Sequence, residues 1–312
     1  MEPDPPKSPP RGLLPLGIAD PEGLRARLEE HGYLADPGLA TACFLALRLH
    51  RPLFLEGEAG VGKTEIAKTL ATVLSAPLIR LQCYEGIDAS QALYDWDFPR
   101  QLLHLRAAEA AGRAGDADAL EAELYDRRFL LARPLLAALE TTPSVLLVDE
   151  VDRADDEFEA FLLEVLSDFT VTVPELGTLR ADVPPVVVVT SNRTREVHDA
   201  LKRRCYYHWI DHPDFDREVA IVRRRVPQAS ARLAAQVAAA VQRLRAEDLF
   251  KPPGVAETLD WTEALIALGA DQLDAELARA TLGSVLKYRE DQERARLLDV
   301  GALVARAVAG GG

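Results

Sequence analysis

The chain has 312 residues, of which 48% are hydrophobic and 28% charged, and it carries a formal net charge of −14. This excess of acidic residues speaks against non-specific binding to nucleic acid or to anionic membranes, because both need clustered Lys and Arg. No apolar stretch is long enough to span a bilayer, and the Pro-rich N-terminus lacks the apolar segment of a signal peptide. We therefore expect a cytoplasmic protein of one large or two ordinary domains, with Cys43, Cys83 and Cys205 as buried thiols.

The predicted elements begin after a flexible tail at residues 1–18. Two helices open the folded part, and each starts at an Asp-Pro pair. Strand-like and helical stretches then alternate, which predicts an α/β fold with a central parallel sheet flanked by helices. The predicted strands are 52–56, 77–83, 144–150, 184–192 and 205–211, and the clearest predicted helices between them are 62–75 and 154–169.

Two segments are longer than the connections of this α/β fold require. Residues 84–133 are polar and Ala-rich over much of their length. Residues 169–183 alternate around a centre that contains Pro and Gly, which predicts a β-hairpin. From residue 213 the strand signals disappear, and helical patterns continue. We therefore predict an α/β domain over 19–212, with these two inserts, and a smaller all-α lid domain over 213–312.

Residues 57–64 read GEAGVGKT and fit the phosphate-loop pattern G-x-x-x-x-G-K-[ST] between a predicted strand and a predicted helix. Glycines let the backbone approach a ligand closely, so that N–H groups and the helix N-terminus face the phosphates. Lys63 is then expected at the β- and γ-phosphates and the Thr64 hydroxyl at Mg²⁺. The alternative is a chance Gly-rich turn. The predicted nucleotide-binding residues of this loop are Gly57, Glu58, Ala59, Gly60, Val61, Gly62, Lys63, Thr64 and Glu65.

The stretch VLLVDEVDRADDEF ends an apolar run with Asp149 and Glu150. Both carboxylates are expected at the C-terminal edge of the sheet, beside the phosphate loop. Asp149 is predicted to bind Mg²⁺ through a water, and Glu150 to orient and deprotonate the attacking water. An acidic helix start is the alternative. An Asp-Glu pair favours hydrolysis of ATP over phosphoryl transfer to a small alcohol.

Three further residues are candidates for the reaction. Asn192 follows the next predicted strand and is expected to contact the γ-phosphate or the attacking water, although asparagine is also common in turns. Arg203 and Arg204 directly precede the last predicted strand. An arginine so far along the chain suits a finger inserted into the site of a neighbouring subunit. The alternative is a basic helix end that complements the helix dipole.

With these motifs in this order, the chain resembles the AAA+ ATPases. It looks most similar to the MoxR group, and within it to the subgroup associated with carbon monoxide dehydrogenase maturation (CoxD-like). The resemblance implies that Lys63 and Thr64 belong to the Walker A motif, Asp149 and Glu150 to Walker B, and Asn192 to sensor 1. The segments that carry it are GYLADPGLATACFLALRLHRPLFLEGEAGVGKTEIAKTLA, LVDEVDRADDEFEAFLLEVLSD, TSNRTREVHDALKRRCYYHWID and KPPGVAETLDW.

The same resemblance implies an arginine finger, with Arg204 as the first candidate and Arg203 as the second. It also places Tyr33 and Leu34 near the adenine, where a core aromatic is the competing interpretation. Many AAA+ lids carry an arginine at the start of a late helix that contacts the γ-phosphate. In this sequence Thr258 occupies the likeliest corresponding position, which leaves open whether a second lid residue senses the nucleotide, and we assign none.

For the whole protein, the resemblance implies ATP and Mg²⁺ as cofactors and a homo-oligomeric, typically hexameric ring. It further implies a partner with a von Willebrand factor A (VWA) domain and a client metalloenzyme, such as a molybdenum-containing carbon monoxide dehydrogenase or a related hydroxylase. The inserts of related rings line pores or contact clients. The segment YDWDFPRQ is therefore a candidate client contact, and a Trp/Phe cluster packed on its own domain is the alternative.

Two other classes of function share parts of this pattern. A nucleic-acid motor, such as a clamp loader, a helicase or a restriction-type translocase subunit, carries the same motifs. However, the predicted hairpin at 169–183 holds a single basic residue, Arg180, where tracking a strand requires several. A monomeric kinase or nucleotide switch would act independently of protein concentration. We therefore predict an ATP-hydrolysing ring motor that remodels or matures a client enzyme.

Overall fold

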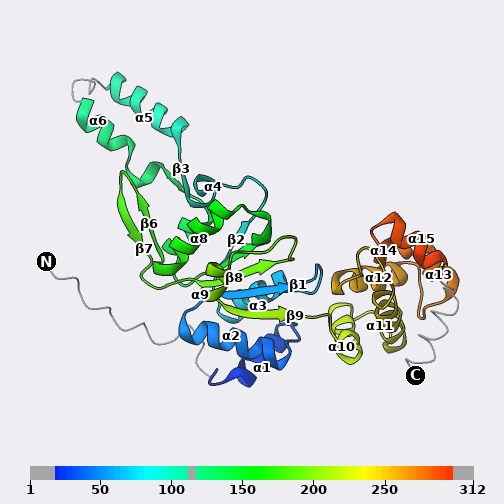
Figure 1. Cartoon of the computed structure of the whole chain (residues 1–312). Helices are drawn as coiled ribbons and strands as arrows, with labels where there is room; N and C mark the ends of the chain where they lie inside the picture. The colour runs from blue at the N-terminus through cyan, green and yellow to red at the C-terminus, as the bar shows by residue number, and fades with distance from the viewer. Residues whose placement is uncertain (1–17, 112–116, 298–312) are drawn as a thin grey trace. The chain divides into compact units, whose positions relative to one another are not determined.

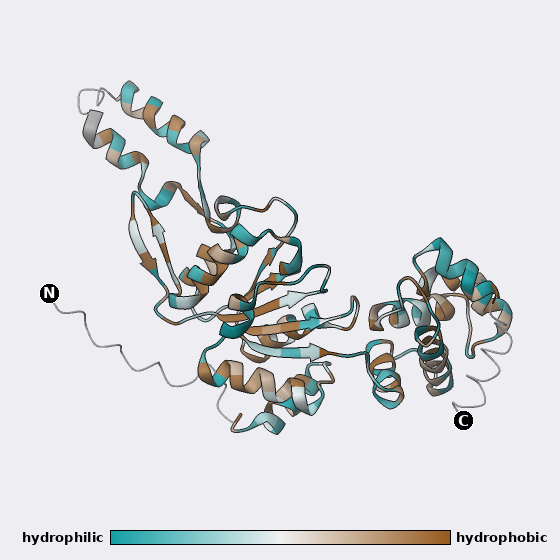
Figure 2. Ribbon diagram, in the orientation of Figure 1, coloured by the Kyte–Doolittle hydropathy of each residue, from teal (hydrophilic) through white to brown (hydrophobic). Residues whose placement is uncertain are grey.

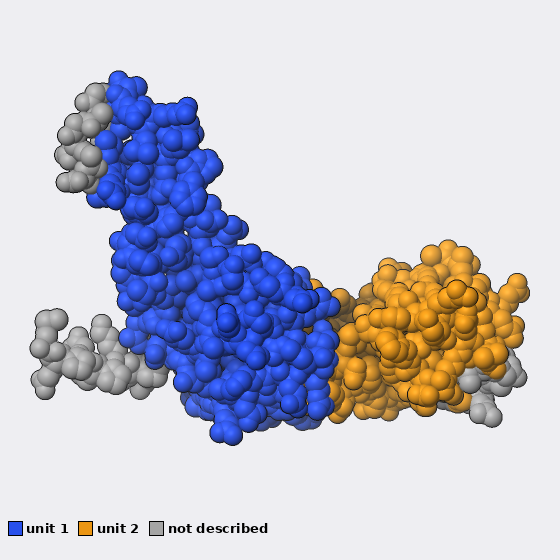
Figure 3. All heavy atoms as spheres, turned by 45° about the horizontal axis from the view of Figure 1, so that its top comes forward, with its two compact units in different colours: residues 1–24, 37–55, 70–208 blue, residues 25–36, 56–69, 209–312 orange. Residues whose placement is uncertain are grey.

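The computed structural model describes residues 18–111 and 117–297, and the chain divides into two compact units (Figure 3). Unit 1 consists of residues 1–24, 37–55 and 70–208, and unit 2 of residues 25–36, 56–69 and 209–312. The predicted tail at 1–18 lies outside the described residues except for its last position. The predicted boundary between an α/β domain and a lid domain near residue 212 stays a prediction.

The central sheet has five strands in the order β2-β5-β8-β1-β9 (Figure 1). Strand β2 (Leu78–Gln82) pairs in parallel with β5 (Val145–Asp149), and β5 pairs in parallel with β8 (Val186–Ser191). Strands β1 (Leu53–Gly57) and β9 (Tyr206–Ile210) complete the sheet. All five predicted strands are confirmed, and so is the predicted α/β fold with its central parallel sheet.

The two middle strands explain why the polar motifs stand where they do. Strand β5 is buried at every residue, and β8 is buried at all but its first, as expected for strands covered on both faces. Their sequences are accordingly runs of Val and Leu that become polar only at the C-terminal ends. Because the two strands are parallel, Asp149 and the residues after Ser191 reach the same edge of the sheet.

Helices and one large hydrophobic core support the sheet in unit 1. Phe54, Leu146 and Val189 from the strands share this core with Phe158 and Leu162 from α8. The side chain of Asp155 caps α8 by accepting a hydrogen bond from the backbone N–H of Phe158 at 2.8 Å. The helices of this part are α2 (Pro37–Leu49), α7 (Pro134–Glu140), α8 (Asp156–Asp168), α9 (Asp199–Arg204) and the short 3₁₀ helix η2 (Val151–Arg153).

The two predicted inserts form distinct structures of unit 1. The first carries two helices, α5 and α6, which lie side by side and extend away from the sheet as an arm (Figure 1). Both helices alternate hydrophilic and hydrophobic segments (Figure 2). The second insert is the predicted antiparallel hairpin, which is confirmed. The elements of the inserts are α4 (Ala89–Leu93), β3 (Tyr94–Trp96), α5 (Phe98–Ala110), α6 (Ala117–Leu124), η1 (Arg127–Phe129), β4 (Leu130–Ala132), β6 (Thr170–Val173) and β7 (Gly177–Arg180).

Unit 2 contains a second, helical core. Trp261 is almost fully buried in it, and its indole N–H donates to the Thr281 hydroxyl at 2.7 Å. Among the described residues, no helix combines the length and the apolar character needed to cross a bilayer. The helices of this core are α11 (Ala231–Arg245), α12 (Val255–Ala267), α13 (Ala275–Ala280), α14 (Leu282–Val285) and α15 (Arg289–Leu297), and unit 2 also contains α10 (Phe215–Arg225). Helices α1 (Pro21–Glu30) and α3 (Lys63–Val73) each begin in one unit and end in the other.

A buried ion pair ties three helices of unit 2 together. The Glu218 carboxylate on α10 is fully buried and accepts two hydrogen bonds from Arg245 on α11, each at 2.7 Å. Its Oε1 also accepts the Thr258 hydroxyl of α12 at 2.7 Å. Thr258, the residue at the position of the missing lid arginine, therefore serves the packing of these helices.

Replacing Glu218 by Gln should destabilise the protein strongly, because it leaves the buried Arg245 guanidinium without a counter-charge. We expect the free energy of unfolding in urea to fall by about 3–5 kcal/mol. The matched control is Asp260→Asn, which removes the exposed pair that Lys287 makes at 3.3 Å in the same unit and should change stability by less than about 1 kcal/mol. Equal effects of the two substitutions would contradict this role of Glu218.

Candidate functional site

The phosphate loop of unit 2 is folded around its own lysine. Lys63 is buried, and its Nζ donates to the carbonyl oxygens of Gly57 at 2.8 Å and Glu58 at 2.6 Å. The Lys63 side chain therefore folds back over the start of its own loop. Helix α3 begins at Lys63, directly after the loop, and this combination of a cation and a helix N-terminus favours bound phosphate.

Two glycines of the loop are required by its shape. A Cβ at Gly57 would lie 2.4 Å from the carbonyl oxygen of Ile210, which is closer than any side chain can approach. Gly62 has a φ of +97°, a conformation that residues with a side chain rarely adopt. Gly57 is thus required by a close backbone contact, and Gly62 by its backbone conformation.

The other residues predicted to contact the nucleotide lie around this loop. The ring of Tyr33 is within 4 Å of the place where a Gly62 side chain would be. The carbonyl of Leu34 accepts two hydrogen bonds from Arg217, at 3.0 and 2.7 Å. Glu65 pairs with Arg225 at 2.7 Å; although burial opposes this, hydrogen bonds from Arg225 and Lys68 lower its pKa. The roles of Tyr33, Leu34 and Glu65 toward a nucleotide stay predictions.

His212, which no sequence motif indicated, also belongs to unit 2. Burial of the His212 imidazole, together with the positive charges of Arg245 and Lys63, lowers its pKa to about 4, while Asp211 acts in the opposite direction. His212 is therefore uncharged at neutral pH. Its buried Nδ1 makes no hydrogen bond within the described part of the chain. The histidine thus adds no positive charge beside the loop.

In unit 1, the carboxylate of Asp149 is buried at the end of β5 and is bonded on both oxygens. Its Oδ1 accepts the Thr190 hydroxyl at 2.6 Å. Its Oδ2 accepts two hydrogen bonds from Arg80, from Nε at 3.0 Å and from Nη2 at 2.6 Å. Arg80 and Thr190 come from β2 and β8, the strands on either side of β5, and neither was predicted from the sequence.

Glu150 stands next to Asp149 in an unusual backbone conformation. Its φ of 56° and ψ of 51° are left-handed, which is uncommon for a residue other than glycine and occurs often at functional sites. The Thr190 hydroxyl accepts the Glu150 backbone N–H at 2.9 Å and so joins both acidic residues to β8.

Three side chains hold the Glu150 carboxylate. Asn192 Nδ2 donates to Oε1 at 3.3 Å, and Gln82 Nε2 donates to Oε2 at 3.1 Å. Arg153 Nε pairs with the same Oε2 at 3.0 Å. The structure therefore brings together Asp149, Glu150 and Asn192, as the predicted sheet edge required, and adds Gln82 and Arg153.

The loop that carries Asn192 is fixed by a buried carboxylate. Asp152 accepts the backbone N–H groups of Asn192 at 3.1 Å and Thr194 at 2.8 Å, and also the Thr194 hydroxyl at 2.7 Å. Asp152 lies in the turn directly after Glu150. Its hydrogen bonds therefore connect the loop that follows β5 with the loop that follows β8. Asp152, which thereby positions the asparagine, was not predicted from the sequence.

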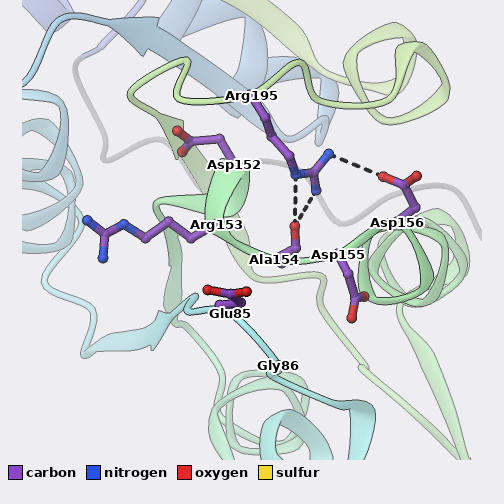
Figure 4. Close-up of a pocket in the computed structure, with 8 residues that line it drawn as sticks. All are labelled: Glu85, Gly86, Asp152, Arg153, Ala154, Asp155, Asp156 and Arg195. Carbon is purple, nitrogen blue, oxygen red and sulfur yellow. Dashed lines mark hydrogen bonds and ion pairs between the residues drawn. The ribbon is translucent and has the colours of Figure 1, made fainter.

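A recess of about 770 Å³ opens beside this turn (Figure 4). Its carboxylates outnumber its two arginines, of which Arg195 donates to the carbonyl of Ala154 at 3.0 Å and to Asp156 at 3.2 Å. Such a lining repels phosphate, so the recess is a poor candidate for the nucleotide site. Its lining residues are Glu85, Gly86, Asp152, Arg153, Ala154, Asp155, Asp156 and Arg195.

The negative field of this edge is also evident at Cys83. Burial, followed by the charges of Asp149, Asp152 and Glu150, raises the pKa of the Cys83 thiol to about 12. The thiol therefore stays protonated at neutral pH and does not act as a nucleophile. All three cysteines are buried, as predicted.

The two arginine-finger candidates end helix α9 in unit 1, and both have exposed side chains. Their backbone carbonyls accept hydrogen bonds from Arg51, at 2.9 Å for Arg203 and 3.2 Å for Arg204. The Arg204 guanidinium makes a long contact of 3.4 Å to the Leu163 carbonyl, and that of Arg203 one of 3.5 Å to Asp199. The helix end is thus fixed by its backbone while both guanidinium groups face solvent.

The residues of both units suit a magnesium nucleotide. Mg²⁺ prefers hard oxygen ligands, such as the Asp149 carboxylate and the Thr64 hydroxyl. The glycine-bounded loop and the lysine that crosses it suit phosphate oxygens. Within each unit, the chemistry of the side chains therefore fits the cofactors that the sequence predicted.

Comparison with known proteins places the α/β part of the chain in a class. Residues 52–205 match the model of the AAA domain (dynein-related subfamily). This part is therefore an AAA+ P-loop domain, and the resemblance to AAA+ proteins is confirmed at that level. No curated protein matches the sequence. The finer resemblance to the MoxR group stays a prediction.

Among solved structures, the chain is similar to RuvB of Thermotoga maritima, described as a Holliday junction branch migration motor. That structure has a TM-score of 0.44 and 16% sequence identity, over 86% of this chain and 72% of that chain. A point mutant of the same protein has a TM-score of 0.48 and 15% identity, over 90% of this chain and 75% of that chain. At these values the similarity supports no conclusion about function.

Proposed function

We propose that this protein is an Mg²⁺-dependent ATPase that works as a ring motor. The observation that carries the proposal is the constellation around Glu150. A carboxylate in a left-handed turn follows a buried aspartate and is held by Asn192 and Gln82. Together with a phosphate loop of the same AAA domain, this constellation supplies the groups that hydrolysis of a nucleoside triphosphate needs.

The binding residues follow from the loop. Lys63 is proposed to exchange its bonds to the Gly57 and Glu58 carbonyls for the β- and γ-phosphate oxygens. Thr64 and Asp149 would hold Mg²⁺, Asp149 through a water. A bound Mg²⁺ neutralises phosphate charge as it develops in the reaction. The other proposed nucleotide contacts are Gly57, Glu58, Ala59, Gly60, Val61, Gly62, Glu65, Tyr33 and Leu34.

The hydrolytic step is assigned to Glu150 and Asn192. Glu150 would accept a proton from the attacking water, and Asn192 would orient that water or the γ-phosphate through its amide. Arg153 and Gln82 both contact Oε2 of Glu150, one of the two oxygens that can take this proton. Proton transfer to Oε2 therefore calls for a rearrangement of these side chains when the nucleotide binds.

The ring follows from the position of the arginines. A solvent-exposed Arg204 at a rigid helix end is proposed to reach the nucleotide of a neighbouring copy, with Arg203 as the second candidate. AAA+ proteins commonly form such rings, and we propose a hexamer. A site completed by its neighbour makes hydrolysis depend on assembly.

The proposed contact with a client lies on the arm formed by α5 and α6. Helix α5 exposes Phe98, Leu102 and Leu103, with 64%, 51% and 68% of their surfaces accessible. Exposed apolar side chains on one helix suit contact with another protein. We propose, from the resemblance to the MoxR group, that this cytoplasmic motor matures a client metalloenzyme with a VWA-domain partner. A molybdenum-containing carbon monoxide dehydrogenase or related hydroxylase is the proposed client.

The trans arginine is tested by mixing two inactive variants. Arg204→Ala and Lys63→Ala should each release phosphate at under about 1% of the wild-type rate, since a finger contributes about three orders of magnitude or more. A mixture of the two should regain turnover, because the intact Arg204 of one copy completes the intact loop of another. Phosphate release is measured with the variants alone and mixed.

Two controls accompany the mixing experiment. Arg279→Ala removes an exposed arginine of α13 and should leave turnover unchanged. Light scattering verifies that mixed assemblies form. If they form and stay inactive, Arg204 is not the trans finger, and Arg203→Ala is examined in the same way. Strong stimulation of the wild-type enzyme by DNA or RNA at moderate salt would instead favour a nucleic-acid motor.

A further inference from the structure

The strongest unassigned feature of the acidic edge is the guanidinium of Arg80. Its Nε and Nη2 atoms both donate hydrogen bonds to the same oxygen of Asp149, Oδ2, at 3.0 and 2.6 Å. A carboxylate oxygen offers two lone-pair directions. Arg80 therefore fills the acceptor capacity of Oδ2, while the Thr190 hydroxyl is bonded to Oδ1.

The two partners of this ion pair differ in their exposure. The Asp149 side chain is 3% exposed, whereas that of Arg80 is 53% exposed. Asp149 cannot leave its buried position and needs a positive partner there, because an unpaired buried carboxylate is strongly unfavourable. Arg80 lies on β2, the edge strand of the sheet, and can swing into water at little cost.

Arg80 is also connected to Glu150 through one amide. Its Nη2 donates to Gln82 Oε1, and Gln82 Nε2 donates to Glu150 Oε2 at 3.1 Å. Because the carbonyl oxygen of this amide accepts Arg80, its NH₂ group is turned toward Glu150. The guanidinium that pairs with Asp149 thus also sets the orientation of the amide that holds Glu150.

We propose that Arg80 is a built-in counter-cation for Asp149, which must leave when a divalent cation binds there. This inference rests on the proposed function, in which Asp149 belongs to the metal site. The exchange replaces one positive partner of Asp149 by another, so the buried carboxylate is paired throughout.

The first test measures metal affinity directly, without turnover. Mn²⁺ replaces Mg²⁺, and the bound fraction is read from the loss of the free Mn²⁺ signal in electron paramagnetic resonance, with the protein saturated with ADP. Arg80→Gln should bind Mn²⁺ about three- to tenfold more tightly than wild type, because the cation no longer competes with a guanidinium. Arg80→Lys keeps a positive charge, and its Mn²⁺ affinity should lie between those of wild type and Arg80→Gln.

The matched control is Arg127→Gln. Arg127 is a half-exposed arginine of unit 1 that pairs with Glu140, away from the acidic edge, and its loss should leave Mn²⁺ affinity unchanged. A second test uses stability in urea with EDTA. Arg80→Gln should lower the urea midpoint in the wild-type background but hardly at all in Asp149→Asn, because the two residues act through one ion pair.

The outcomes separate this inference from the function on which it rests. ADP and ATP binding is measured beforehand by calorimetry in the presence of Mg²⁺; if neither nucleotide binds, the nucleotide function falls and this inference with it. If they bind but Arg80→Gln has wild-type or weaker Mn²⁺ affinity, only the role of Arg80 is overturned. Additive effects of Arg80→Gln and Asp149→Asn on stability would overturn it as well.

Discussion

Replacing Lys63 by Ala is expected to remove ATP binding almost completely. The lysine makes two bonds to carbonyl oxygens of its own loop, at 2.8 and 2.6 Å, so its ammonium group is already positioned in the loop where phosphate is proposed to bind. Losing two charge-assisted bonds to phosphate should weaken ATP binding by about two orders of magnitude or more. Titration of the protein with a fluorescent ATP analogue measures this loss.

Lys68→Ala is the matched control for this variant. Lys68 stands on the same helix, one turn and a half further on, and pairs with Glu65 at 3.2 Å on the surface. Its removal should change ATP affinity by less than about threefold, because exposed pairs contribute little. Wild-type ATP affinity in Lys63→Ala would remove the phosphate-loop assignment.

Replacing Glu150 by Gln is expected to separate binding from hydrolysis. The amide keeps the size of the side chain and can still accept the Asn192 amide at Oε1, but it cannot take a proton from water. Turnover should fall by about two to four orders of magnitude, the contribution of a general base, while ATP affinity stays within a few-fold of wild type. Phosphate release and nucleotide titration give the two quantities.

Glu157→Gln serves as the comparison for Glu150→Gln. Glu157 is an exposed acidic residue in the first turn of α8, close to Glu150 in sequence but outside the constellation of Asn192 and Gln82. The Glu157→Gln variant should hydrolyse ATP at the wild-type rate. If Glu150→Gln also hydrolyses ATP at the wild-type rate, another group must activate the water.

The sheet was predictable because its strands carry a local signal. The runs in β5 and β8 are apolar until their last residues, and parallel pairing then places Asp149, Glu150 and Asn192 at one edge. Order along the chain and the direction of the strands are sufficient for this inference. The phosphate loop was equally predictable, because its backbone makes a close approach at Gly57 and has a positive φ at Gly62, and both favour glycine.

The partners of the two carboxylates were not predictable, because they depend on strand order and register. Arg80 and Gln82 look like the polar residues of an ordinary half-exposed strand, and nothing local indicates that β2 lies beside β5. Only the register that pairs Gln82 with Asp149 brings these side chains to the acidic edge. The period-2 spacing of Arg80 and Gln82 near the strand end was the available signal.

Asp152 and Thr190 were missed for a related reason. Both read as ordinary turn or strand residues, yet Asp152 fixes the loop of Asn192, and Thr190 bridges Asp149 to the Glu150 backbone. These roles arise where three chain segments meet, so no single window of sequence contains them. At the position of the missing lid arginine, the structure supplies an explanation that the sequence lacked. Thr258 donates a buried hydrogen bond to Glu218 there.

The most direct measurement is the identity of the nucleotide retained by the protein after one exposure to Mg·ATP and rapid gel filtration. If the loop and the carboxylates serve one nucleotide, wild type should retain mainly ADP, Glu150→Gln mainly ATP, and Lys63→Ala neither. Retention of ADP by Glu150→Gln at the wild-type level, or of ATP by Lys63→Ala, would contradict the assignment of these residues to a single ATPase site.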